Sequence, residues 1–422
     1  MWLLLVACTG PAKVIIGADP AVAPTEPPSD ETLETLETLT GTGPDDAPDP
    51  PDDDNDEEDD DRVFQIDEVH QVEITLDGAG VRALQVDPYA YVDADISWDG
   101  DVYEGVGLRI KGRLGSLRSL AGKSAFKLDL LQFGGTGRIE GLEKLNLNNM
   151  VQDNTQLKEF AAYSTYRAMG LVAPRLGYAW VKVNGDDFGL YSVVEDYDDE
   201  MLKHNFEDPS GNLYDGDYNL YPNGSYDLVD FLTATQDFMG LDEGIDVGHA
   251  DVHAVTDAIA GSIGTPRFES DVGARVDLDW FARFWAVTAW IGQYDSYCYY
   301  SNNYRIYFDP VDGLARIMPW DPDWAFYPGT PLSSPYGVLA QACQADAACY
   351  ARFKEALSEV TEAVAREGVI TEIERANSLI DPWFTQDPRA EVAVGDRRYN
   401  QGELIQWYER RDAALTREFG LR

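Results

Sequence analysis

The pattern of apolar residues changes midway along this chain, and the change restricts the folds that it can adopt. Up to about residue 195, short runs alternate between apolar and polar residues, as half-buried strands do. Asp99-Gly100 and Asn184-Gly185 each join two such runs and are typical of tight hairpins. Residues 154–169 have helical spacing instead, and Asp153 is a candidate N-cap. The expected strands are residues 72–76, 90–98, 102–111, 124–131, 178–183 and 189–195.

The second half of the chain is mainly helical in pattern. The segment that begins at Asp277 or Asp279 and runs to Ile291 is apolar nearly all round, which indicates a helix buried in a core. The two halves together predict an α+β protein, with a β-rich lobe at residues 63–195 and a mainly helical lobe at residues 196–422. Further helices are expected at residues 252–263, 351–366, 370–380 and 403–419.

The N-terminal part is expected to contain a targeting segment followed by a linker. Residues 18–62 are rich in Pro, Thr, Asp and Glu, and twelve carboxylates lie within residues 45–61, so we expect a disordered, extended linker. Residues 1–17 contain Leu5-Val-Ala-Cys8, which resembles the cleavage and lipidation site of a bacterial lipoprotein, although the basic start of a signal peptide is missing. The alternative is an apolar stretch without a targeting role. The lipoprotein interpretation places the protein in the bacterial envelope or outside the cell, touching a membrane only through a lipid on Cys8.

The overall charge excludes one class of partner. The formal net charge is −44, and a chain this acidic repels DNA and RNA, so no nucleic-acid partner is expected.

The cysteines fit an oxidising compartment. Cys343 and Cys349 are close enough in sequence to close a small disulfide loop there. Cys298 is expected to be a buried free thiol.

The sharpest chemical pattern lies between Asp295 and Asp323. Asp295 follows the buried helix, Asn302 and Asn303 come next, and a strand pair then leads to Asp321 and Asp323. Phosphotransferases use acidic and amide side chains in this order to position a hydroxyl and to hold Mg²⁺ on nucleotide phosphates. Paired acids in turns are also common as simple caps. A negative charge at a helix C-terminus interacts unfavourably with the helix dipole, which argues against a purely structural role for Asp295.

A basic cluster stands out against the acidic background. It surrounds turns that contain Gly112, Gly115 and Gly122, and clustered positive charge at such turns suits a polyphosphate. The alternative is a solvated strand face. The cluster consists of Arg109, Lys111, Arg113, Arg118, Lys123 and Lys127.

Four blocks in order resemble the CotH family, the spore-coat-protein-H-like atypical kinases. They are residues 106–116 with 123–128, residues 145–149 with Asp153 and its helix, residues 183–191 leading to Glu195, and residues 295–323. Together they span roughly residues 70–330. The resemblance implies a two-lobed protein-kinase-like fold. It also implies transfer of the ATP γ-phosphate to Ser or Thr of extracytoplasmic proteins, with Mg²⁺ or Mn²⁺.

The resemblance also assigns roles to individual residues. Asp295 would be the catalytic Asp, Asn302 or Asn303 would bind the metal with Asp321, and Asp323 would be a neighbour or a second ligand. Lys127, or else Lys123, would reach the phosphates, and Glu195 would lie near the hinge between lobes. The full set expected to bind the nucleotide is Arg109, Lys111, Lys123, Lys127 and Glu195.

The spacing of the amides departs from the family pattern. Asn302 and Asn303 follow Asp295 by seven and eight residues, whereas protein kinases place the Asn about five residues after the Asp. The alternative function is therefore a catalytically inactive pseudokinase or scaffold of the cell envelope. Two further hypotheses are a carboxylate hydrolase that uses Asp295 with Asp321 or Asp323, and a Ca²⁺-dependent adhesion module.

Overall fold

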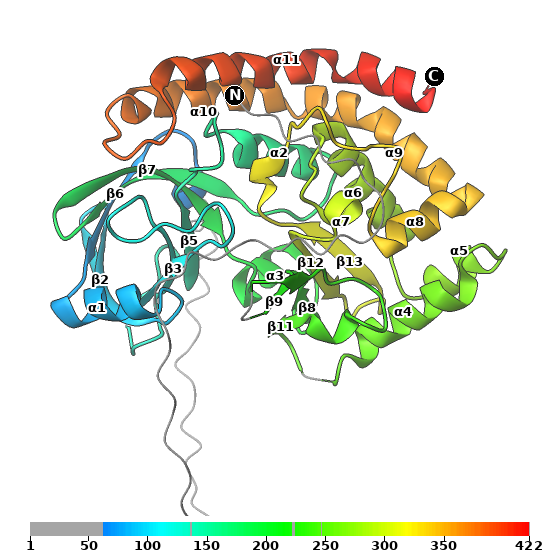
Figure 1. Ribbon diagram of the computed structural model, residues 1–422, viewed down its shortest axis with the longest axis horizontal. Coiled ribbons are helices and arrows are strands. Elements are labelled where there is room, and N and C mark those ends of the chain that lie inside the picture. Colours follow the sequence, from blue (N-terminus) through cyan, green and yellow to red (C-terminus); the bar gives the residue numbers. More distant parts are fainter. Residues whose placement is uncertain (1–61, 136, 222–223, 246, 422) are drawn as a thin grey trace, which may run out of the picture.

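The computed structural model describes residues 62–135, 137–221, 224–245 and 247–421. The lipidation site expected at Cys8 and the acidic linker lie outside these residues, apart from Arg62. The described chain is an α+β protein, with a β-barrel on one side and a larger, mainly helical part beside it (Figure 1). No helix in the described part of the chain is both long enough and apolar enough to cross a membrane.

The N-terminal part is a closed barrel with the strand order β1-β2-β3-β4-β5-β7-β6. Neighbouring strands are antiparallel except β1 and β6, which run parallel and close the barrel. Its interior is filled by apolar side chains such as Ile74, Leu108 and Phe126, all fully buried. The strands are β1 (His70–Thr75), β2 (Val92–Trp98), β3 (Asp101–Lys111), β4 (Ala125–Asp129), β5 (Lys144–Asn148), β6 (Leu176–Val183) and β7 (Asp186–Glu195).

The two predicted hairpins are confirmed. Asp99-Gly100 joins β2 to β3, and Asn184-Gly185 joins β6 to β7. Asp99 and Asn184 both have a φ of 51°, the left-handed conformation that the tight turn requires. The sequence pattern did not indicate α1 (Gly78–Val86) or the strand β5.

The predicted helix in the β-rich half is α2 (Lys158–Ala168), which packs beside the barrel. It begins at Lys158 rather than at residue 154, because the chain bends at residues 154–156 and Gln156 has a left-handed φ of 62°, which a helix does not allow. Asp153 still caps it from a distance, since its carboxylate accepts the Lys158 N–H at 2.7 Å and the Thr155 N–H at 2.8 Å. Gly170, at a φ of +69°, ends the helix.

The helical part surrounds a four-stranded sheet with the order β11-β8-β12-β13. Its strands are β8 (Asn212–Asp215), β11 (Gly240–Glu243), β12 (Tyr304–Phe308) and β13 (Ala315–Pro319), with the separate pair β9 (Asn219–Leu220) and β10 (Tyr226–Asp227). Its helices are α3 (Asp199–Asn205), α4 (Ala250–Ser262), α5 (Phe268–Val272), α6 (Leu278–Ile291), α7 (Tyr297–Tyr300), α8 (Val338–Ala345), α9 (Ala347–Arg366), α10 (Val369–Phe384) and α11 (Val394–Phe419).

The central helix of this part is α6, as its apolar pattern predicted. Asp277 caps it by accepting the Trp280 N–H at 2.9 Å. Trp285 on α6 stacks on Phe353 of α9, with ring centroids 3.9 Å apart. The long helices α10 and α11 run across the outer side of both parts (Figure 1). The core therefore continues from α2 through α6 to these outer helices.

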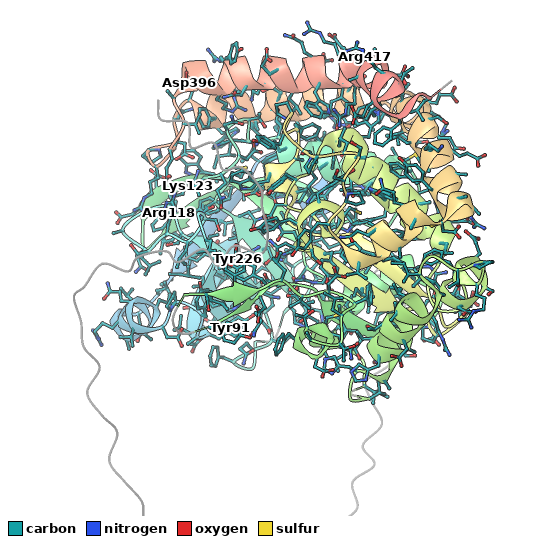
Figure 2. All side chains as sticks on the ribbon, turned by 45° about the vertical axis from the view of Figure 1, so that its right-hand side comes forward. Tyr91, Arg118, Lys123, Tyr226, Asp396 and Arg417 are labelled. Atoms are coloured by element: carbon teal, nitrogen blue, oxygen red, sulfur yellow. A yellow bond between two sulfur atoms is a disulfide. The ribbon has the colours of Figure 1, made fainter. Side chains whose placement is uncertain are left out.

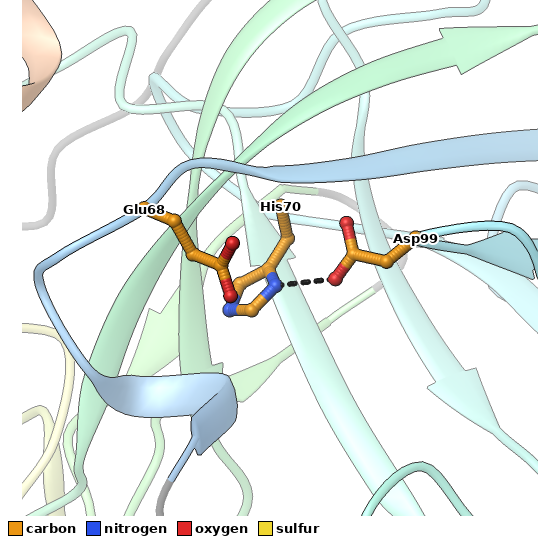
Figure 3. Close-up of side chains that lie close together, drawn as sticks. All are labelled: Glu68, His70 and Asp99. Atoms are coloured by element: carbon orange, nitrogen blue, oxygen red, sulfur yellow. Dashed lines mark hydrogen bonds and ion pairs between the residues drawn. The ribbon is translucent and has the colours of Figure 1, made fainter.

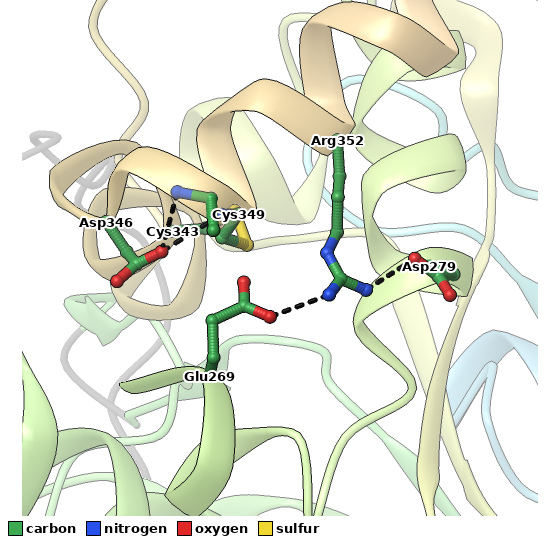
Figure 4. Close-up of a disulfide and its surroundings, with 7 residues drawn as sticks. Glu269, Asp279, Cys343, Asp346, Cys349 and Arg352 are labelled. Carbon is green, nitrogen blue, oxygen red and sulfur yellow. Dashed lines mark hydrogen bonds and ion pairs between the residues drawn. A yellow bond between two sulfur atoms is a disulfide. The ribbon is translucent and has the colours of Figure 1, made fainter. Parts of the chain in front are cut away.

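The disulfide Cys343–Cys349 is present and joins α8 to the start of α9, as predicted. Asp346 within this loop caps α9 by accepting the Ala348 and Cys349 N–H groups, each at 3.0 Å. One turn further, Arg352 pairs with acids on α5 and α6 (Figure 4). Cys298 is buried and free, also as predicted.

Candidate functional site

A cavity of about 550 Å³ lies between the barrel and the four-stranded sheet. Side chains of β3, β4 and β5 line its barrel side, and side chains of β8, β12 and the loops beside them line the opposite side. Eight of the ten side chains predicted from sequence line this cavity, and Lys123 and Glu195 do not. The eight are Arg109, Lys111, Lys127, Asp295, Asn302, Asn303, Asp321 and Asp323.

The barrel side of the cavity is a row of polar side chains. Arg109, Lys127 and Asn146 lie opposite one another on β3, β4 and β5, so their side chains point to the same face. Phe126 and Leu128, the neighbours of Lys127, point into the barrel core. The alternation of a strand therefore supplies both the core and the charged wall of the cavity.

Asp295 is held by two amides on the opposite side. The Asn302 amide donates to Asp295 Oδ1 at 3.0 Å, and the Asn303 amide donates to Asp295 Oδ2 at 3.1 Å. Asn303 also donates to the Asp321 carbonyl at 3.4 Å, which joins this loop to the end of β13. The one-turn helix α7 takes up the extra residues between Asp295 and the amides. Both amides therefore reach the Asp295 carboxylate in spite of the longer spacing.

The backbone at this site adopts an uncommon conformation. Ser301, Asn303 and Asp321 have φ values of 49°, 51° and 42°, in the left-handed region. Such a conformation is costly for residues other than glycine and clusters at functional sites. The Asn302 Oδ1 atom is buried and has no hydrogen-bond partner. It is an acceptor left unpaired on a residue that lines the cavity.

Three carboxyl groups of the cavity resist ionisation. Burial raises the pKa of Asp295, and the nearby Asp321 raises it further, against the amide hydrogen bonds. Burial also raises the pKa of Asp321, which Lys111 and Arg305 oppose. The pKa of Asp323 lies well above its usual range because of burial, and then because of Asp321. The neighbouring cations therefore do not offset the cost of ionising these three half-buried carboxyl groups.

Lys111 and Glu159 are linked through one amide, and sequence reasoning missed Glu159. The Lys111 ammonium donates to Asn148 Oδ1 at 2.6 Å, while the Asn148 amide donates to Glu159 Oε1 at 2.8 Å. Burial lowers the pKa of Lys111 to about 8, against the attraction of Asp321 and Glu159. Burial and then Asp321 raise the pKa of Glu159 to about 8. The feature that could have identified Glu159 is a charged residue on α2, a helix whose side chains are buried on nearly every side.

Lys127 already has an acidic partner within the chain. Its ammonium pairs with Asp196, which also accepts a hydrogen bond from Asn146 at 3.1 Å. Burial opposes ionisation of Asp196, but Lys127 outweighs it and lowers the pKa of Asp196 to about 2. Arg305 on β12 is likewise paired, with Asp215 at 2.5 Å. Part of the positive charge in the cavity is therefore neutralised.

Lys123 and Glu195 correct the predicted set of nucleotide contacts, because the structure uses both elsewhere. Lys123 pairs with Asp387 at 2.5 Å, and both side chains are almost fully buried. Glu195 pairs with Arg175 at 2.7 Å. Successive side chains of a strand point to opposite faces, so the cavity receives Asp196, which follows Glu195 at the end of β7.

The residues of the cavity fit a divalent cation bound through oxygen. Asp321, Asp323 and the unpartnered Asn302 Oδ1 are oxygen ligands of the kind that Mg²⁺ prefers. The incompletely compensated carboxyl groups favour the same conclusion, because a bound cation stabilises their ionised forms.

A second group of possible metal ligands lies outside the cavity, on the barrel. Glu68, His70 and Asp99 have ligand atoms within 4.8 Å of one another (Figure 3). The buried His70 ring on β1 is joined through Nδ1, at 2.7 Å, to Asp99 in the turn of the first predicted hairpin. This contact already explains His70 as part of the barrel.

Comparison with known proteins identifies a family for this chain. The model of a family described as CotH kinase protein matches residues 108–415, a range that includes the eight predicted residues in the cavity. The inner spore coat protein H of Bacillus subtilis (strain 168) is 25% identical over 189 residues, which are 43% of this chain and 50% of that relative. The chain thus aligns with half the length of this curated relative. Because the family model covers most of the described residues, the chain belongs to the CotH kinase protein family.

Proposed function

We propose that this cavity binds ATP with a divalent cation and transfers the γ-phosphoryl group to a Ser or Thr hydroxyl of another protein. The barrel would be the N-terminal lobe of a kinase-like fold, and the helical part the C-terminal lobe. One observation carries the proposal. A half-buried Lys, an Asp held by two amides and a second Asp meet in one cavity, and they follow one another along the chain in the order that protein kinases use.

The barrel side of the cavity would bind the phosphates. Lys111 donates to an amide, and Arg109 lies over the Tyr91 ring, so these contacts leave both charges available to an anion. Glu159, reached through Asn148, would hold Lys111 in place, as the helix-borne Glu of a protein kinase holds its Lys. The Lys127 ammonium already pairs with Asp196 and would contribute less to phosphate binding.

Asp295 would act on the acceptor. Its carboxylate is oriented by Asn302 and Asn303, and its raised pKa makes it a stronger proton acceptor than an ordinary carboxylate. The acceptor oxygen forms a bond to the γ-phosphorus as the bond from that phosphorus to the bridging oxygen of ADP breaks. The hydroxyl proton passes to Asp295. Most of the rate enhancement would come from positioning and from fixed charge.

Asp321, Asp323 and Asn302 Oδ1 are the groups proposed to hold the metal. A bound Mg²⁺ or Mn²⁺ would supply neutralisation of phosphate charge during transfer. The protein part of the site would keep these oxygens in place through the Asn303 bond to the Asp321 backbone and the Tyr163 hydroxyl, which accepts the Asp321 N–H at 3.1 Å.

The proposed enzyme would work outside the cytoplasm. The disulfide Cys343–Cys349 is a bond that persists in oxidising compartments. Lipidation at Cys8 would tether it to the cell envelope, and the acidic segment would hold it away from the membrane. The substrate would then be a protein of the same compartment.

A pseudokinase is the second candidate. The pairing of Lys127 with Asp196 and of Arg305 with Asp215 reduces the positive charge that the cavity offers to phosphates. A scaffold of this kind would bind ATP without transferring phosphate.

Transfer of γ-labelled phosphate by the full chain tests the proposal. With Mg²⁺ or Mn²⁺ present, wild-type protein should label itself or an added acceptor protein. Asp295→Ala should lose transfer by about 1,000-fold or more while ATP still raises its melting temperature. Asp321→Ala should lose both phosphate transfer and the rise in melting temperature that ATP causes. Asp312→Ala, in the turn between β12 and β13, is the matched control and should retain activity. Transfer by Asp295→Ala at the wild-type rate would overturn the assignment.

A further inference from the structure

The segment between α10 and α11 fastens a loop that lines the cavity. We call residues 385–393 the strap and residues 112–124, between β3 and β4, the roof loop. We propose that the strap positions the roof loop through Glu391 and Arg118, and that these two residues thereby set the affinity for ATP. The inference rests on the proposed function, because it concerns how the same cavity holds the nucleotide.

One end of the roof loop belongs to the cavity. Gly112, Arg113, Leu114 and Ser116 line it. Gly112 and Gly115 have φ values of +99° and +89°, which disfavour any other residue. Loops of this kind bring backbone N–H groups close to phosphates. The position of this end should therefore matter to a bound polyphosphate.

The other end of the roof loop is held by the strap at several points. Lys123 pairs with Asp387 in a buried contact. Arg389 donates to the carbonyl oxygens of Leu120, at 3.1 Å, and of Gly122. The Arg389 guanidinium also lies 3.5 Å from the centre of the Phe188 ring on the barrel. Figure 2 shows Arg118 and Lys123 on the barrel, below the start of α11 at Asp396.

Arg118 connects the strap to the cavity end of the loop. Its guanidinium forms two parallel bonds with Glu391, each of 2.7 Å. It also donates to the Gly115 carbonyl at 2.9 Å and to the Leu117 carbonyl at 3.0 Å. A two-bond Arg–carboxylate contact fixes the guanidinium plane as well as its position. Glu391 therefore orients Arg118, and Arg118 holds the carbonyl of a glycine beside the phosphate-binding end.

These two residues act at a distance from the cavity. Neither Arg118 nor Glu391 lines it, and their side chains are 30% and 39% exposed. A surface ion pair of this exposure contributes little to global stability. Substitution there should loosen the roof loop without unfolding the protein. Lys123 and Asp387 are unsuitable for the test, because removal of either leaves the other charge buried and unpaired.

The dissociation constant for ATP, measured on the full chain with Mg²⁺, is the readout. Glu391→Gln and Arg118→Lys should each raise it about tenfold, as expected for loss of a charge-assisted contact. Glu391→Asp keeps the charge and should raise it less. The melting temperature of the nucleotide-free protein should change by the same small amount as in the control. The matched control is Glu269→Gln, which breaks an ion pair with Arg352 far from the cavity (Figure 4).

Each outcome has a distinct meaning. Weakened ATP binding in both variants, with an unchanged control, supports the inference. Wild-type affinity in Glu391→Gln and Arg118→Lys overturns it and leaves the proposed function standing. No ATP binding by the wild-type protein overturns the proposed function and the inference together.

Discussion

The ion pair of Lys127 with Asp196 gives the most quantitative prediction. The pKa of the Asp196 carboxyl falls from 3.8 to about 2 in the folded protein, in spite of its burial. At about 1.4 kcal/mol for each tenfold change in proton affinity, the net effect is about 2 to 3 kcal/mol of stability at neutral pH. Lys127→Met removes the main source of this stabilisation and leaves a buried carboxylate. The variant should therefore lose about 2 to 4 kcal/mol of unfolding free energy at pH 7.

The pH dependence has a definite sign. The folded-state pKa of Asp196 is depressed, so its contribution is present above the unfolded pKa of 3.8 and is lost as the pH falls toward about 2. The difference between Lys127→Met and wild type should shrink over that window. A second change, Asp196→Asn, should restore part of the stability of Lys127→Met at pH 7, because the unpaired charge is then gone.

Urea unfolding followed by tryptophan fluorescence measures these free energies. Lys182→Met is the matched control, since Lys182 faces Asp187 at 3.7 Å with both side chains more than 40% exposed. This control should change stability by less than about 0.5 kcal/mol. A loss equally small in Lys127→Met, at neutral and acid pH alike, would show that the buried pair of Lys127 and Asp196 does not stabilise the fold.

Three further predictions follow from the site and its surroundings. Asn302→Ala should weaken metal-dependent ATP binding about tenfold by calorimetry and also lower kcat, because Asn302 offers Oδ1 and donates to Asp295, whereas Asn303→Ala should mainly lower kcat, because Asn303 supports Asp295 and the Asp321 backbone. Asp198 caps α3 by accepting the Met201 N–H at 3.1 Å. Burial, then the neighbouring acids, raise its pKa from 3.8 to about 8, so the stability that its protonated form confers is present below 3.8 and is lost as the pH rises to about 8. Asp198→Asn should consequently raise the melting temperature at pH 9 and leave it nearly unchanged at pH 4. Reduction of the Cys343–Cys349 disulfide, whose cysteines are 6 apart in sequence, should cost about 2 kcal/mol in unfolding experiments.

The hairpins and the core helix of this fold were predicted correctly, because short-range sequence patterns determine them. Alternation and the Asp99-Gly100 and Asn184-Gly185 turns specified the hairpins, and the apolar helix before Asp295 emerged as the core helix α6. Closure of the barrel depends on the parallel pairing of β1 with β6, strands about a hundred residues apart. No single segment encodes that pairing, so the sequence indicated a β-rich half without indicating a barrel.

The candidate site shows the same division. Local sequence patterns identified the residues from Asp295 to Asp323 and the charges of Arg109, Lys111 and Lys127. In the structure these two groups line one cavity. The partner of Lys123 lies 264 residues further on, at Asp387, and no spacing within the basic cluster signals it. The long-range partner, rather than the charge, decides whether a Lys is available to a ligand.

Parallel incubation of the full chain with α-labelled and with γ-labelled ATP distinguishes phosphoryl transfer from nucleotide transfer and from binding alone. Protein should acquire label from γ-labelled ATP alone, in the presence of Mg²⁺ or Mn²⁺, and Asp295→Ala should abolish it. Label from α-labelled ATP would show transfer of the nucleotide rather than of phosphate. No label from either, with ATP still raising the melting temperature, would contradict catalysis and leave a nucleotide-binding scaffold.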